Sequence, residues 1–362
     1  MGVLSALLIL ALLVVVHEAG HFLAATSQGI RISSFNVGFG PALLQRQRNG
    51  VLFALRAIPL GGYVSFPDDD PDSEIDPRDP DLLKNRPLPQ RALVIAAGVL
   101  ANLLLAWVVL VGQGVFVGIP DGFTATGGVL ITAVSPDQAA ESAGLKAGDK
   151  LLSLNGESIG GGTTAVQELV KAVKSAPGSE LQVGLERNGE PLSLQLQPAD
   201  VGGMGRIGAQ LSPVGEEHFS RTANPLLIVG EANRQFGSII KRTVEGFAAL
   251  ATRFGETASQ VSGPVKIVEM GAQLADQGGA SLFLFAALIS INLAVLNALP
   301  LPLLDGGQFL LLLIEGLRGR PLPERLQMAF MQSGLVLLLG LSAILIVKDT
   351  SQLSLVRQLM GN

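Results

Sequence analysis

Residues 14–21 read V-V-V-H-E-A-G-H, and the rest of the sequence is interpreted from this stretch. His17 and His21 lie four residues apart, so on an α-helix their imidazoles share one face and can bind a single ion. Glu18 stands beside them, close enough to take a proton from a water molecule at that ion. Neutral imidazoles suit Zn²⁺, and H-E-x-x-H is the spacing of zinc hydrolases. The sequence therefore predicts a zinc site with two histidine ligands and Glu18 as general base.

The motif lies in an apolar segment that is long enough to cross a bilayer. Residues 4–16 carry no charge, and the apolar run resumes after the motif as far as Ala25. One ionisable group at membrane depth costs about 2.5–3.5 kcal/mol or more, so the motif indicates a functional site rather than a chance match. Because residues 1–8 contain no Lys or Arg, we expect 4–25 to be a retained transmembrane helix and not a cleaved signal peptide.

The composition is typical of a membrane protein that carries a soluble part. Of 362 residues, 48% are hydrophobic and only 15% are charged. The net charge is −5, and no basic aromatic patch indicates a nucleic-acid partner. The chain has no cysteine, which excludes disulfides and thiolate ligands. Zinc must therefore be held by His, Asp or Glu side chains.

The remainder of the N-terminal half, up to residue 119, is expected to belong to the membrane core. Residues 30–64 read as β-strands with a tight turn at Asn49 and Gly50, and 66–90 as a solvated, flexible acidic loop. A second span is expected at 92–117. It contains Asn102, an amide that needs a partner at membrane depth, either as an interhelical hydrogen bond or as a substrate contact.

A soluble domain follows at residues 120–200. The string G-G-V-L-I-T-A-V-S-P-D-Q-A-A-E-S-A-G-L-K-A-G-D-K-L-L-S-L-N-G, at 127–156, resembles the bacterial-type PDZ domain, an α+β fold. That resemblance implies a groove for an extended peptide, often a C-terminus, beside a strand edge. The alternative is a domain that only filters substrates by size. A linker at 201–280 should follow, with an amphipathic helix within 224–260 at the membrane surface.

The second half of the membrane core is expected at residues 281–362. The apolar run 281–314 is too long for one straight span and is interrupted at 297–307 by N-A-L-P-L-P-L-L-D-G-G. Prolines and glycines break the helix there, and the freed backbone requires a protein-lined or watered cavity. Asp305 in this break is the predicted third zinc ligand, with the fourth position left for water. Alternatively, Asp305 only caps the helix that follows it.

A last span at 326–347 brings the expected number of transmembrane helices to about four. The fold class is then a polytopic α-helical membrane protein with a membrane-associated β-hairpin region and one PDZ domain. If loops 27–91 and 316–325 are cytoplasmic, their arginines satisfy the positive-inside tendency, and the PDZ domain is extracytoplasmic. The absence of cysteine and of a transit-type leader favours a bacterial cytoplasmic membrane and leaves a thylakoid membrane open.

Together these motifs resemble the site-2 protease family of intramembrane zinc metalloproteases, in particular the bacterial branch that includes the regulator-of-sigma-E protease. The similarity covers nearly the whole chain. The matching strings are H-E-A-G-H at 17–21, F-N-V-G-F-G at 35–40, I-P-L-G-G-Y-V at 58–64, A-G-V-L-A-N at 97–102, S-G-P-V at 262–265 and N-A-L-P-L-P-L-L-D-G-G at 297–307.

The resemblance implies a zinc metalloendopeptidase that cuts transmembrane segments of membrane-protein substrates. The process would be regulated intramembrane proteolysis, such as release of an anti-sigma factor or cleavage of signal-peptide remnants. One Zn²⁺ would be held by His17, His21 and Asp305, and Glu18 would be the catalytic base. The competing hypothesis is a non-catalytic PDZ scaffold or receptor with a structural metal. It would lack the base or close the site with a fourth ligand, whereas this sequence has the base and offers no such ligand.

Substrate contacts are implied as well. Asn297 would help to hold the substrate, and the region of Phe39 and Gly40 would belong to a membrane-embedded hairpin that presents an edge to an unwound substrate helix. Val99 stands where the family often has proline, which puts the role of Asn102 in question. The expected partners are the lipid bilayer, a membrane protein with a transmembrane helix, and a peptide C-terminus at the PDZ domain.

Overall fold

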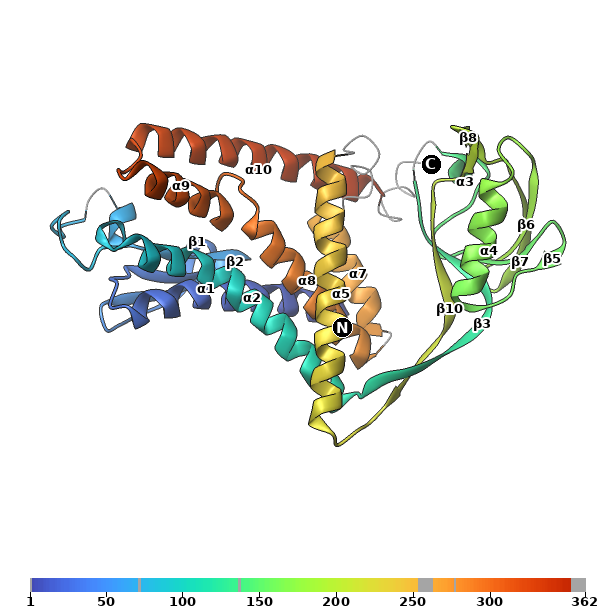
Figure 1. The fold of residues 1–362 in the computed structure, drawn as a ribbon, viewed down its shortest axis with the longest axis horizontal. Coiled ribbons are helices and arrows are strands. Elements are labelled where there is room, and N and C mark those ends of the chain that lie inside the picture. The colour runs from blue at the N-terminus through green and yellow to red at the C-terminus, as the bar shows by residue number, and fades with distance from the viewer. Residues whose placement is uncertain (1, 71–72, 136–137, 253–262, 277, 353–362) are drawn as a thin grey trace. The chain divides into compact units, whose positions relative to one another are not determined.

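The structure is a computed structural model that describes residues 2–70, 73–135, 138–252, 263–276 and 278–352. Its chain divides into two units (Figure 1). The helical unit holds the described residues of 1–117, 222–251 and 262–362, and the sheet unit holds those of 118–221 and 252–261. Residues 253–260 of the predicted amphipathic segment and the first residue of the 262–265 string lie outside the described residues.

Three helices of the helical unit are long and apolar enough to cross a bilayer. They are α1 (Gly2–Ser27), α2 (Leu88–Phe116) and α8 (Gly279–Ala298), with 26, 29 and 20 residues. The first two confirm the helices expected at 4–25 and 92–117. Helix α10 (Glu324–Gln352) contains the segment expected as the last span. Since three candidate spans are found among the described residues, a fourth span remains a prediction, as does the orientation in the membrane.

The long apolar run after residue 281 is broken, as predicted. Helix α8 ends at Ala298, and α9 (Asp305–Arg318) begins seven residues later. Pro300 and Pro302 lie in the gap. Gly306 and Gly307 pack directly on backbone carbonyls of residues 298–301, where any Cβ would overlap those atoms. The sequence therefore folds the break into a tight connection that starts α9 with Asp305.

Strands β1 (Ser34–Arg48) and β2 (Val51–Ser65) form the predicted hairpin. Asn49 and Gly50 make its turn with φ of 50° and 81°, which Asn and Gly tolerate well. The ribbon curls back on itself, because Phe35 pairs with both Phe53 and Val64. Residues 34–37 therefore lie between two segments of β2, and residues 62–65 are left at an edge.

The acidic loop makes specific contacts where a flexible segment was expected. It contains two short 3₁₀ helices, η1 (Pro67–Asp69) and η2 (Leu83–Asn85). Arg31, just after α1, pairs with Asp79 at 3.0 Å, and Arg86 pairs with Asp81 at 2.7 Å. The Arg31 ion pair fastens the described part of the loop to the chain just after α1, and the Arg86 pair lies within the loop.

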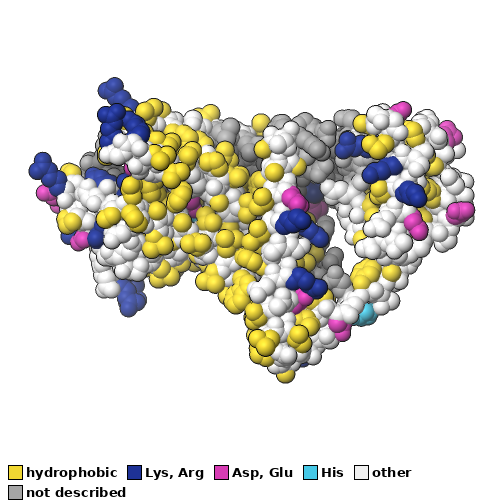
Figure 2. Space-filling view, in the orientation of Figure 1, with side chains coloured by type: hydrophobic (Ala, Val, Ile, Leu, Met, Phe, Trp, Pro, Cys, Tyr) yellow, Lys and Arg dark blue, Asp and Glu magenta, His cyan; other side chains and the backbone are white. Residues whose placement is uncertain are grey.

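Helix α5 (Pro225–Thr252) confirms the amphipathic helix as far as it is described. It packs on the apolar spans: Trp107 of α2 donates to Asn233 at 2.7 Å, and Thr243 donates to Asn292 of α8 at 2.8 Å. Figure 2 shows charged side chains along its outer face, whereas hydrophobic side chains cover most of the visible face over α2 and α9. Helix α7 (Pro264–Asp276), which the sequence did not indicate, packs against α1.

Among its described residues, the sheet unit has a six-stranded sheet, a separate two-stranded hairpin and two helices. Five strands follow the order β10-β3-β4-β6-β7, β5 pairs with β4, and β8 pairs with β9 in a separate hairpin. The elements are β3 (Ile119–Val134), α3 (Ala139–Ser142), β4 (Lys150–Leu154), β5 (Glu157–Ser158), α4 (Gly162–Lys174), β6 (Leu181–Arg187), β7 (Glu190–Leu196), β8 (Ala199–Val201), β9 (Met204–Arg206) and β10 (Ala209–Ser220).

One boundary of the sheet unit differs from the expectation. Residues after 200 were assigned to a linker, but β10 pairs with β3 from Ala209 to Ser220. Ile207, just before β10, is buried in the same apolar core as Val129 and Leu151. This pairing joins residues 75 to 101 positions apart in the sequence, so no local pattern in 201–220 indicated it.

Candidate metal centre

The structure brings the three predicted metal ligands together. His17 and His21 face the same way from α1, and Asp305 reaches them from the first turn of α9. Asp305 Oδ2 lies 3.1 Å from His17 Nε2 and 3.5 Å from His21 Nε2. The two Nε2 atoms are 3.3 Å apart. Leu304 is the N-cap of α9, and no side chain caps the helix there, so the geometry does not favour a purely capping Asp305.

These separations fit a zinc ion. In a tetrahedral site with ligand distances of about 2.0–2.1 Å, neighbouring ligand atoms lie roughly 3.3 Å apart. The three observed distances, 3.1, 3.3 and 3.5 Å, bracket that value. Asp305 Oδ2 is buried and accepts no well-aligned hydrogen bond from the described residues, which is costly unless a cation binds it. Two imidazoles and one carboxylate form the donor set of zinc sites that keep an open position.

Helix α2 orients both imidazoles from behind. His21 Nδ1 donates to the carbonyl oxygen of Val94 at 2.8 Å. A carbonyl can only accept, so Nδ1 carries the proton and Nε2 keeps its lone pair toward Asp305. On the other ring, His17 Nδ1 lies 3.1 Å from Nδ2 of Asn102. Rotating this amide by 180° about its Cβ–Cγ bond would bring its oxygen to Nδ1 and give His17 the same tautomer.

Glycines allow α2 to approach so closely. A Cβ on Gly98 would lie 2.7 and 2.8 Å from Cε1 and Nε2 of His17 and would overlap His21 Nε2. One on Gly20 of α1 would overlap the carbonyl of Ala97. Gly98 is a site position that the sequence reasoning missed. The available signal was a small residue in a span otherwise rich in leucine and valine.

The proposed base lies between the metal ligands and the hairpin edge. A Cβ on Gly62 of β2 would sit 3.1 Å from Glu18 Cγ and 2.8 Å from the carbonyl oxygen of Asn36. The backbone N–H of Val64 hydrogen-bonds to the Glu18 carboxylate. The edge segment 62–65 therefore lies directly against this carboxylate.

The four predicted substrate contacts lie in different surroundings. Asn297 Nδ2 is 3.3 Å from His17 Nε2, so this amide faces the metal cluster. Asn102 is completely buried behind His17, a place suited to positioning the ring. Phe39 and Gly40 lie on β1: the Phe39 ring stacks on Tyr63 at 5.9 Å, and the Gly40 carbonyl accepts a hydrogen bond from an arginine of β2.

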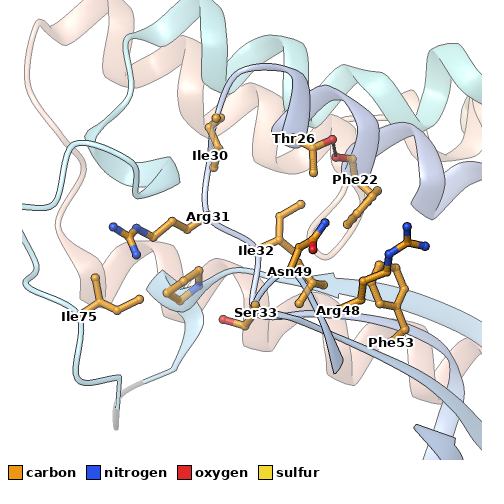
Figure 3. A pocket seen from close by; sticks show the side chains of 14 residues that line it. Phe22, Thr26, Ile30, Arg31, Ile32, Ser33, Arg48, Asn49, Phe53 and Ile75 are labelled. Carbon is orange, nitrogen blue, oxygen red and sulfur yellow. Dashed lines mark hydrogen bonds between the residues drawn. The ribbon is translucent and has the colours of Figure 1, made fainter. Parts of the chain in front are cut away.

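A pocket of about 640 Å³ lies on another side of α1 (Figure 3). Phe22 and Phe53 line it, Arg31 and Arg48 stand at it, and Ile75 contributes from the acidic loop. The ring of Phe22 packs on the hairpin, whereas the preceding residue, the proposed metal ligand His21, faces α2. The pocket is therefore separate from the metal cluster.

Comparisons with known proteins extend along the whole chain. The model of Peptidase family M50 matches residues 5–341. A protein of Nostoc sp. whose name marks it as a candidate zinc metalloprotease is 51% identical over 357 residues, which are 98% of this chain and 97% of that protein. A Synechocystis protein with the same type of name is 48% identical over 99% of this chain and 97% of its own. The chloroplastic membrane metalloprotease ARASP of Arabidopsis thaliana is 42% identical over 99% of this chain and 81% of its own.

Among solved structures, the PDZ domain of an SdrC-like protein from Listeria monocytogenes aligns with 24% of this chain and 90% of that domain, at 21% identity and a TM-score of 0.22. That likeness is too weak to support an argument. The family match and the near full-length relatives are decisive, and the resemblance seen in the sequence is confirmed. This chain belongs to peptidase family M50, the site-2 protease family, and is a membrane zinc metalloprotease.

Proposed function

We propose that this protein is an intramembrane endopeptidase that hydrolyses peptide bonds within transmembrane segments of other membrane proteins. The depth of the metal cluster carries the proposal. His17 is ten residues before the end of α1 at Ser27, which corresponds to about 15 Å along the helix. A hydrocarbon core is about 30 Å thick, so if α1 spans the bilayer, the cluster lies near its middle.

The residues would divide the chemistry between binding and proton transfer. His17, His21 and Asp305 would hold zinc, which when bound polarises a carbonyl and makes water more acidic. Glu18 takes a proton from the attacking water and delivers it to the leaving nitrogen as the C–N bond breaks. Asn297 directs its amide N–H into the site and can donate to the substrate carbonyl. The close contact with β2 keeps the Glu18 carboxylate in place.

A substrate helix must unwind before it can react, because an intact helix hides its own carbonyls in hydrogen bonds. The β1–β2 hairpin offers the freed backbone new partners. Its edge segment 62–65 adjoins Glu18, so a strand added there would pass beside the base. Phe39 and Gly40 stand farther along the same ribbon, and we propose that they contact the flanks of the unwound segment.

Cleavage within the membrane also suggests a biological role. We propose regulated intramembrane proteolysis, such as release of an anti-sigma factor or removal of signal-peptide remnants. The sheet unit would lie outside the cytoplasm as a PDZ domain that binds a peptide C-terminus or filters substrates by size. Cyanobacterial and chloroplastic relatives support a bacterial cytoplasmic membrane or a thylakoid as its location.

Glu18→Gln tests the proposal. The variant keeps the shape of the side chain but cannot act as a base, so cleavage should fall by about 10²–10⁴-fold while bound zinc stays at the wild-type level. Membrane-protein fragments should be compared by proteomics in cells that carry either form, and zinc should be measured on both purified proteins. Unchanged cleavage by Glu18→Gln would refute the assigned base. Fragments absent from both cell lines would favour the non-catalytic scaffold.

A further inference from the structure

Glu315 of α9 is a buried carboxylate that gathers donors from three separate segments. Its side chain is 7% exposed. One oxygen accepts from Arg91 Nη1 of α2 at 3.1 Å. The other accepts from the backbone N–H of Leu322 and from Nε2 of Gln327 in α10, both at 3.1 Å. Both carboxylate oxygens are thus satisfied, and α9 is joined to α2 and to the start of α10.

This ion pair lies on the two helices that frame the metal cluster. Asp305 is ten residues before Glu315 on α9, about 15 Å away along the helix. Val94, whose carbonyl orients His21, follows Arg91 on α2 by three residues, just under one turn. The ion pair therefore joins the helix that carries the carboxylate ligand to the helix that orients an imidazole ligand.

Apolar side chains from both helices lie close to the ion pair in sequence. Leu88 and Ala92 of α2 and Phe309 and Leu313 of α9 line a groove of about 250 Å³ with other apolar residues, and neither Arg91 nor Glu315 lines it. Loose apolar surfaces can slide past one another, because dispersion and burial have little directional preference. A charge-assisted hydrogen bond is directional, and buried ion pairs are best attested as devices that set register.

We propose that Glu315 and Arg91 are positioning residues that set the register of α9 against α2 and so keep Asp305 within bonding distance of the two imidazoles. This inference rests on the proposed ligand role of Asp305. Losing the pair should let α9 shift along α2. Metal affinity should then fall by about tenfold or more, because ligand distances in a metal site hold within about 0.2 Å.

The test uses full-length protein in detergent and measures zinc affinity by competition with a chelator. Glu315→Gln and Arg91→Gln should each weaken zinc binding by about tenfold or more and alter the visible spectrum of the cobalt-substituted protein. Arg318→Gln, on an exposed residue of the same helix, is the matched control and should bind zinc like the wild type.

The outcomes separate this inference from the proposed function. If the pair only stabilises the fold, the Gln variants will unfold at lower temperature but bind zinc with wild-type affinity and spectrum, and the proposal is overturned. If Glu315→Gln fails to fold, Arg91→Gln, which leaves two donors on the carboxylate, decides alone. If the Asp305→Ala variant binds zinc as tightly as the wild type does, the assignment of Asp305 as a ligand is itself wrong.

Discussion

Gly98→Ala tests the metal centre without altering any proposed ligand. Gly98 is buried on α2, where the helix backbone faces both imidazoles. The new Cβ would lie 2.7 Å from Cε1 of His17 and closer still to Nε2 of His21. Ordinary contacts begin at 3.4 Å, so moving from 2.7 to 3.4 Å requires a shift of about 0.7 Å. Either the rings must move by at least that distance, and His21 by more, or α1 and α2 must separate.

Such a shift exceeds what a metal centre tolerates. Ligand distances in metal sites hold within about 0.2 Å. His21 cannot turn freely, because its Nδ1 donates a hydrogen bond to Val94, on the same helix that carries the new methyl group. We expect zinc affinity to fall at least 10–100-fold, or about 1.4–2.7 kcal/mol. Alanine also improves helix propensity by up to about 1 kcal/mol, which offsets part of the overpacking cost of about 1–3 kcal/mol. The fold should therefore survive while the site is damaged.

The assay is zinc per chain after equilibration with a competing chelator, followed by peptidase activity on the same preparation. Gly112→Ala is the matched control, because it lies on the same helix and, among the described residues, its Cβ would meet only Phe283, at 3.4 Å. The control should retain zinc and activity. If Gly98→Ala holds zinc as tightly as the control does, α2 does not approach the imidazoles as described, and the proposed geometry is refuted.

Three other substitutions test separate parts of the molecule. Gly62→Ala places a methyl group against Glu18 from the hairpin edge. Turnover should fall by about tenfold or more, because a small misplacement of a catalytic group slows the reaction, and the zinc content should stay unchanged. Asn102→Ala removes the partner of an imidazole nitrogen and should weaken zinc binding by about 10–100-fold in chelator competition. In the sheet unit, burial alone would raise the pKa of Asp149, but hydrogen bonds from Arg187 and a backbone N–H outweigh it and hold the pKa below its ordinary value. This stabilisation is present above pH ~4 and is lost as pH falls through the lowered pKa. Asp149→Asn should therefore be less stable than wild type by about 1.5–3 kcal/mol at pH 7, and the difference measured by thermal unfolding should vanish in acid.

Local signals explain what the sequence could predict. The four-residue spacing of His17 and His21 puts them on one helix face wherever that helix packs. The hairpin turn at Asn49 and Gly50 could be predicted, because few other residue types adopt positive φ without strain. Asp305 was predicted as a ligand because a carboxylate in a broken apolar run needs a partner. The structure places it beside both imidazoles.

Features that depend on which segments meet were not predictable. The sequence around Gly62 does not indicate that a carboxylate lies against it, and the sequence around Gly98 does not indicate two neighbouring imidazoles. The acidic loop was predicted to be flexible because its many charged residues are close together in the sequence. The arginine that pairs with Asp79 is Arg31, which precedes the whole β1–β2 hairpin in the sequence. The partner of β10 is likewise set by tertiary pairing and not by its own pattern.

Helix α2 carries none of the proposed ligands and no base, yet it contacts both imidazoles and, through the Arg91–Glu315 pair, is joined to the helix that carries Asp305. Arg91, Val94, Gly98 and Asn102 are spaced by three, four and four residues, which places them in one stripe along the helix. Arg91 secures the helix of the carboxylate ligand, Val94 and Asn102 each hold one imidazole, and Gly98 leaves space for both rings. Val99, where the family often has proline, is about 100° away from Gly98 around the helix, so it does not disturb the stripe. A rotation of α2 by one residue would remove all of these contacts at once, and the metal centre therefore depends on the register of a helix that contributes no ligand to it.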